Sequence, residues 1–226
     1  MKNTFKFIFV IMPILTVSNA FAQMSNFEGL SVFASTGSNT WKVGSANPAD
    51  VDSSGAVQAG STVDSVDSAG APLFLGVEYT YPVNEKFTLG VSVEGNVLGS
   101  GSVGGSRRLA DGTADLDFTA QVKTGAYQIS VVPGMLVGPH SLLYGKVGYY
   151  SASTDLIIAG ETSSYTSSGM GYGLGLKQIL TKNFFVFGEI DTRVGIAKNQ
   201  TSPDKLWSFD AKLDGTSILI GAGYKF

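Results

Sequence analysis

The chain has no cysteine and a single histidine, His140. Without thiols it can form no disulfide, no thiolate zinc site and no cysteine nucleophile. Charge is scarce as well: only 15% of the 226 residues are charged, and the formal net charge is −3. Proteins that bind nucleic acid carry clustered basic charge. The composition therefore argues against a thiol-dependent enzyme and against a nucleic-acid-binding protein.

Long hydrophobic runs are also missing. Past the N-terminal segment, no apolar run approaches the ~20 residues that a membrane helix needs. The mean hydropathy of +0.17 is nevertheless high for a soluble protein, and the 29 glycines exceed the roughly 7% of average usage. A membrane protein without membrane helices has one architecture left, the closed β-barrel.

The first segment is predicted to be a secretory signal peptide over residues 1–22. Two lysines precede or border a short apolar core over residues 7–17, and small residues, Ala20 and Ala22, stand just before the expected cleavage point. The apolar core is too short to span a bilayer. We expect cleavage after Ala22, export from the cytoplasm, and a single mature domain over residues 23–226.

The rest of the chain alternates apolar and polar residues with period two, the pattern of strands with one apolar face. In residues 73–81 the odd positions are apolar or aromatic. Residues 87–97 repeat the pattern after a turn-like break, so the two segments are predicted to form a hairpin. The predicted strands number eight, an even number as is usual for bacterial single-chain barrels. They cover residues 26–36, 73–81, 87–97, 127–137, 142–150, 170–177, 184–194 and 217–226.

The connections between these strands alternate in length. Short turns are predicted at residues 82–86, 138–141 and 181–183. Between them lie long segments rich in Gly, Ser, Thr and Asp that lack sustained apolar alternation. Outer-membrane barrels have short periplasmic turns and long extracellular loops. We therefore expect four long extracellular loops, near residues 37–71, 99–117, 151–168 and 195–214.

The last residues and three strand motifs carry a family resemblance. Tyr224-Lys225-Phe226 places two aromatic residues on one face, which resembles the assembly signal of Gram-negative outer-membrane proteins. Together with the motifs at 132–134, 143–149 and 187–189, it makes the chain similar to the small OmpA-, OmpX- and Opa-like outer-membrane barrels. The resemblance implies an all-β, eight-stranded, antiparallel up-and-down transmembrane barrel in the outer membrane. It also implies contact with outer-membrane lipids and lipopolysaccharide, and with the barrel assembly machinery during biogenesis.

The alternation places charged residues inside the predicted barrel. An eight-stranded barrel is just wide enough for side chains to fill, and isolated buried charges are costly, so we expect these residues to pair across the lumen. Two interpretations stay open: a structural polar core, and a narrow channel for small solutes. Inward glycines either accommodate the inward aromatic rings or leave a water-filled route. The predicted inward charges are Glu78, Glu94, Glu189, Asp191, Lys146, Lys177, Arg193 and Lys225.

An enzyme is the other class to weigh. Lipid A deacylases are barrels of similar size that use serine with histidine, but His140 and Ser141 fall in a predicted periplasmic turn, away from a substrate in the outer leaflet. Nucleophilic catalysis needs its base and its substrate within reach. Omptin-like proteolysis is disfavoured because no histidine lies on a predicted extracellular loop. We expect no catalytic residue, no metal site and no cofactor.

The predicted outer surface offers few specific contacts. Arg107 and Arg108 are candidate contacts to lipopolysaccharide phosphates, because arginine forks match phosphate geometry; a plain exposed pair is the alternative. Outward aromatic residues fit interface girdles, whereas a soluble lipocalin-like barrel would leave a glycine-rich face in water. We predict a monomer with a structural or surface-interaction role in membrane integrity, adhesion or antigenicity. A narrow porin-like channel is the alternative, and a lipid-modifying enzyme comes third.

Overall fold

The computed structural model describes residues 26–51, 57–59, 62–65, 68–98, 102–108, 114–122, 124–158, 161–196, 198–201 and 207–226. The predicted signal peptide lies outside this part of the chain. No helix in the described part is long and apolar enough to cross a membrane. The strands are β1 (Gly29–Val51), β2 (Val57–Ala59), β3 (Thr62–Ser65), β4 (Ser68–Gly70), β5 (Leu73–Pro82), β6 (Phe87–Leu98), β7 (Ser102–Arg108), β8 (Ala114–Val122), β9 (Tyr127–Gly138), β10 (Ser141–Ile158), β11 (Glu161–Ile179), β12 (Phe184–Gly195), β13 (Lys198–Thr201) and β14 (Trp207–Lys225).

Eight of these strands close into an antiparallel barrel. Their order around the wall is β11-β12-β14-β1-β5-β6-β9-β10, and β10 pairs with β11 to complete the ring. The seam joins β1 to β14, with Ser31 opposite Lys225. The prediction of an all-β, eight-stranded up-and-down barrel is confirmed.

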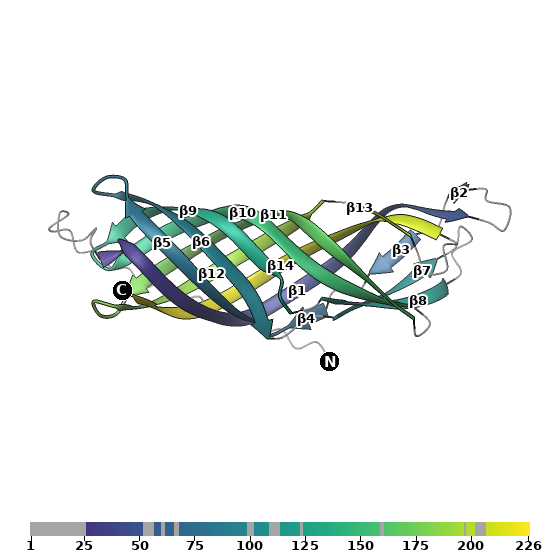
Figure 1. The fold of residues 1–226 in the computed structure, drawn as a ribbon, viewed down its shortest axis with the longest axis horizontal. Coiled ribbons are helices and arrows are strands. Elements are labelled where there is room, and N and C mark those ends of the chain that lie inside the picture. The colour runs from purple at the N-terminus through teal and green to yellow at the C-terminus, as the bar shows by residue number, and fades with distance from the viewer. Residues whose placement is uncertain are drawn as a thin grey trace, which may run out of the picture.

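The two ends of the barrel differ. The tight turns gather at one end, while β2, β3, β7, β8 and β13 lie at the other (Figure 1). Side chains stabilise the turns: Asn84 Oδ1 accepts hydrogen bonds from the backbone N–H groups of Lys86 and Phe87 at 2.9 and 3.1 Å. Asx-type bonds of this kind are typical of tight turns. The turn end corresponds to the periplasmic side of an outer-membrane barrel.

Several segments that the sequence analysis assigns to loops are strands instead. β1 continues to Val51, β10 to Ile158, β11 starts at Glu161, and β14 starts at Trp207. The 19 residues of β11 span about 65 Å at ~3.4 Å per residue, far more than an apolar band ~25 Å tall requires, even with a tilt of ~40°. Outside the bilayer an outward residue need not be apolar. The hydrophobic alternation therefore stops while the strand pairing continues.

The barrel is apolar outside and polar inside. In β5, Tyr79 and Tyr81 are 52% and 59% exposed, whereas Glu78 and Thr80 beside them are buried. The same alternation runs along β12, where every second residue from Phe185 is buried. A soluble barrel would have the opposite arrangement, so the lipocalin-like alternative is wrong.

Candidate functional site in the barrel lumen

One lysine organises the charges at the middle of the lumen. The Nζ atom of Lys146, on β10, lies 3.0 Å from Glu94 Oε1, 2.5 Å from Glu189 Oε1 and 3.5 Å from Asp191 Oδ2. All four side chains are buried. The hydroxyl of Tyr144 donates a hydrogen bond to Glu189 Oε2 at 2.9 Å. A single ammonium thus joins carboxylates from β6 and β12 across the barrel.

Arg193 extends this network toward the extracellular end. Its Nη2 atom lies 2.9 Å from Asp191 Oδ2 and 3.7 Å from Glu94 Oε1. Its other nitrogens donate to Gln128 Oε1 at 3.2 Å and to Ser217 Oγ at 3.0 Å. The guanidinium therefore ties β12 to β6, β9 and β14, with charged and neutral acceptors around it.

A separate ion pair lies nearer the turn end. Lys177 Nζ is 2.6 Å from Glu78 Oε1, and the hydroxyl of Thr80 donates to the same oxygen at 2.8 Å. The ammonium also lies over the ring of Phe185, 4.8 Å from its centroid. Since β11 and β5 are not neighbours in the wall, this pair crosses the lumen.

Seven of the eight predicted lumenal charges thus lie in these two clusters. The eighth, Lys225, lies beside the last turn, where its backbone carbonyl accepts a hydrogen bond from Asn183 at 2.7 Å. The sequence alone does not identify side-chain partners such as Gln128 and Ser217. Alternation marks them as inward-facing, but only the stagger of the strands decides which charge each one meets.

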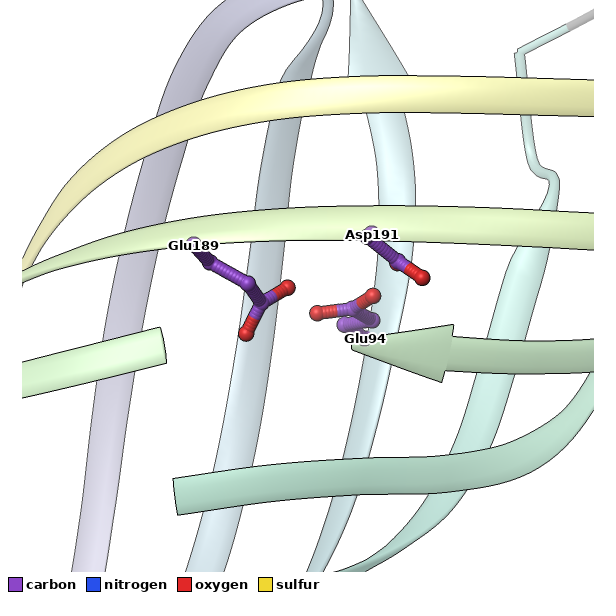
Figure 2. Close-up of side chains that lie close together, drawn as sticks. All are labelled: Glu94, Glu189 and Asp191. Atoms are coloured by element: carbon purple, nitrogen blue, oxygen red, sulfur yellow. The ribbon is translucent and has the colours of Figure 1, made fainter. Parts of the chain in front are cut away.

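Three of the carboxylates could in principle hold a metal ion. Oxygens of Glu94, Glu189 and Asp191 lie within 4.8 Å of one another, and Figure 2 shows these side chains pointing toward one another. The ammonium of Lys146, however, lies within 3.5 Å of all three. It takes the place that a cation held by these oxygens would occupy, so we describe the cluster as an ion-pair network.

Aromatic rings lie in the lumen on the turn side of the network around Lys146. The rings of Phe33 and Phe187 meet edge to face, with their centroids 5.6 Å apart. Each ring lies over a glycine of a neighbouring strand, where a Cβ atom would come within 2.2 to 2.3 Å of ring carbon. At these positions the inward glycines accommodate rings, which is one of the two roles that the sequence left open for them. The pairs are Gly76 with Phe33, Gly221 with Phe187 and Gly223 with Phe185.

A second apolar layer closes the lumen on the extracellular side. Trp41 and Tyr150 are buried here, and the hydroxyl of Tyr150 donates to the Leu213 carbonyl at 2.5 Å. The Arg193 guanidinium lies 5.8 Å from the centroid of the Trp41 ring. The network around Lys146 therefore lies between aromatic side chains on both sides.

The cavities that border these side chains are small. Three lumenal cavities among the described residues have volumes of about 10 Å³ each, which is room for about one water molecule. The central cavity is bordered by the ion-pair network and by Ser92, whose buried hydroxyl has no protein partner among the described residues. Water is the ligand that fits this cavity.

The other predicted site residues lie away from the lumenal network. Arg107 and Arg108 pair through their backbones with β3, and their side chains lie outside the described part. Tyr224 and Phe226 are exposed on the outer face, with ring centroids 5.2 Å apart. His140 lies exposed in its turn. Its neighbour Ser141 donates a hydrogen bond to Gln178 Oε1 at 2.5 Å.

Comparison with known proteins agrees with this architecture. Residues 7–226 match the family described as "Outer membrane protein beta-barrel domain". The fold is similar to that of OprG from Pseudomonas aeruginosa, with a TM-score of 0.57 and 16% identity over 89% of this chain and 98% of that one. No curated protein matches the sequence.

Two further solved structures cover similar shares of the chain at lower structural similarity. Ail of Yersinia pestis has a TM-score of 0.43 and 17% identity over 88% of this chain and 99% of its own. The protease OmpT from Escherichia coli has a TM-score of 0.46 and 11% identity over 88% and 97%. The family match covers nearly the whole sequence. The chain therefore belongs to the outer membrane protein β-barrel family and is a barrel of the outer membrane.

Proposed function

We propose that the mature barrel, residues 23–226, is a closed and monomeric outer-membrane scaffold with a structural or surface-interaction role. The observation that carries this proposal is the shared Lys146 ammonium, which joins opposite walls at the middle of the lumen. A solute pathway would require these ion pairs to separate. Removing one partner from a buried ion pair costs about 3–5 kcal/mol, which supports a lumen that stays closed.

The extracellular part of the barrel supports the surface role. β1, β10, β11 and β14 extend well past the apolar band, and β7 and β8 add a hairpin at the same end. Such strands give a rigid platform for contacts with lipopolysaccharide, a host surface or an antibody. Arg107 and Arg108, on β7, remain our candidates for contact with lipopolysaccharide phosphates.

Catalysis has little support in the geometry. The single histidine lies at the turn end and its neighbouring serine bonds elsewhere, so the requirement for a base within reach of a nucleophile is not met there. In the proposed life cycle, the signal peptide directs export and the barrel assembly machinery recognises Tyr224 and Phe226.

The test of a closed lumen is conductance in a planar bilayer. Purified protein is first shown to be folded by comparing the gel migration of unheated and boiled samples. We expect no discrete current steps from the folded wild-type barrel. Reproducible steps would instead establish the narrow channel and overturn the closed scaffold.

A complementation experiment separates the structural role from the surface role. Cells lacking the gene receive either the full chain or a variant in which the β10–β11 hairpin is shortened by deleting residues 153–166. Detergent sensitivity reports membrane integrity, and adhesion of whole cells reports surface contact. If the short variant restores only detergent resistance, the extracellular strands serve adhesion. If it restores both, the extracellular hairpin is not the working surface.

A further inference from the structure

An apolar groove crosses the outer, lipid-facing side of the barrel. Its volume is about 770 Å³, within the ~300–1,000 Å³ typical of small-molecule sites. The groove runs across six adjacent strands of the wall, β12, β14, β1, β5, β6 and β9. Most of its lining residues point away from the barrel axis, unlike those of the lumenal cavities, and the inward-facing Phe33 and Glu94 border it from below.

The register of the strands explains why the surface is hollowed here. Two neighbouring rows of outward residues run side by side across the wall. The first row contains mostly large residues: Phe184, Tyr224, Val32, Val77 and Val93. The second row contains, in order, Ala222, Ala34, Leu75, Gly95 and Tyr127. Three of these five residues are small. The alanines and the glycine lower the surface beside a wall of larger side chains.

The groove has two ends at opposite sides of the membrane. Phe184 is the first residue of β12, directly after a turn, whereas Tyr127 is the first residue of β9, which starts from the extracellular side. Rows perpendicular to strands tilted by ~35–45° climb obliquely through the bilayer. Five strand spacings of ~4.8 Å give a length of about 24 Å. The shape is therefore long, narrow and closed by aromatic rings, Phe184 with Tyr224 at one end and Tyr127 at the other.

We propose that this groove binds one acyl chain of a phospholipid, extended across the strands, with the headgroup at the turn end. Lys182 is exposed in the turn just before Phe184, where its charge complements a lipid phosphate. A second copy of the chain fits less well, because a two-fold interface apposes the same patch from both subunits. Two concave patches would enclose a void instead of packing.

The experiment is native mass spectrometry of the full chain folded in detergent and incubated with palmitoyl-oleoyl phosphatidylethanolamine. Ala34→Leu with Ala222→Leu fills the groove. The matched control is Thr192→Leu with Thr216→Leu, an opposed pair of exposed outward residues outside the groove. Comparing gels of unheated and boiled samples shows that each variant is folded.

We expect one retained lipid per barrel in the wild type and in the threonine control, and loss of the lipid-bound peak in the filled variant. Lys182→Gln should lower the retained fraction without abolishing it. Equal retention by the filled variant, or no lipid peak in the wild type, would overturn the proposal. So would preference for lipopolysaccharide in a mixed incubation, or a dimer mass that disappears when the groove is filled.

Discussion

The ammonium of Lys146 lies 2.5 Å from the carboxylate of Glu189, although β11 separates their strands in the barrel wall. The two side chains therefore meet inside the lumen, past the inner face of β11. They belong to a network that also contains Glu94 and Asp191. Such a network fixes the distances between strands that share no backbone hydrogen bonds. Its stability can be tested one partner at a time.

Replacing Lys146 by methionine should lower the free energy of unfolding by about 3–5 kcal/mol, because three carboxylates lose the cation that they share. Urea titration of the barrel in lipid vesicles measures this change. Val147→Met, at the outward neighbour, is the control and should be close to neutral. An equal effect in both variants would mean that the ammonium contributes no more than its packing.

The Lys177 and Glu78 pair predicts non-additive behaviour. Each single replacement by methionine strands a buried charge, whereas the double replacement removes both. We expect the double variant to be more stable than either single variant, with a coupling free energy of about 1–3 kcal/mol in a double-mutant cycle. Simple additivity of the two changes would show that the 2.6 Å contact is energetically unimportant.

The packing of rings over glycines predicts a contrast between two positions. A Cβ on Gly221 would lie 2.3 Å from the Phe187 ring, whereas one on Gly188, which faces outward, would meet nothing closer than 4.0 Å. Gly221→Ala should therefore destabilise the barrel by about 1–3 kcal/mol through overpacking. Gly188→Ala should be neutral or slightly stabilising. The temperature at which each variant loses the gel mobility of the folded barrel compares the two. Similar temperatures would contradict the contact between Gly221 and the Phe187 ring.

The lipid-facing assignment of β6 predicts a large cost for charge at Val91. This residue is 55% exposed in the middle of the strand, and arginine near the bilayer midplane costs about 2–4 kcal/mol. Val83, which is 58% exposed beside a turn, is the matched position. Val83→Arg should insert into vesicles normally. Equal insertion of Val91→Arg would show that Val91 does not lie in the apolar band of the barrel.

Phe226 separates assembly in the cell from stability in vitro. The residue is 69% exposed, and its ring packs against that of Tyr224. Phe226→Ala should therefore change the free energy of unfolding, measured by refolding from urea, by less than about 1 kcal/mol, as for an ordinary surface substitution. If the residue is part of the assembly signal, the folded yield in the outer membrane of cells should nevertheless fall strongly. Unchanged cellular yield would remove Phe226 from the signal.

The sequence predicts the part of the barrel that lies within the apolar band of the membrane. The apolar band forces outward residues such as Val91 to be apolar and leaves inward residues such as Glu94 polar, so the eight barrel strands could be found by their period. Above the band this constraint ends, so the outer half of β11 lacks the apolar alternation by which a strand is predicted. The ion pairs could not be assigned, since Lys177 and Glu78 are 99 residues apart and meet through barrel stagger. The groove likewise depends on register across six strands.

The seam between β1 and β14 has a consequence for how the protein acquires its structure. Ser31 and Lys225 become neighbours only at closure, and until then both strands carry unpaired N–H and C=O groups along one edge. Each unpaired group costs several kcal/mol in hydrocarbon, so an open, partly formed sheet is unstable within the bilayer. Barrel closure must therefore be concerted, and the free edge of β1 must be shielded from lipid until β14 pairs with it.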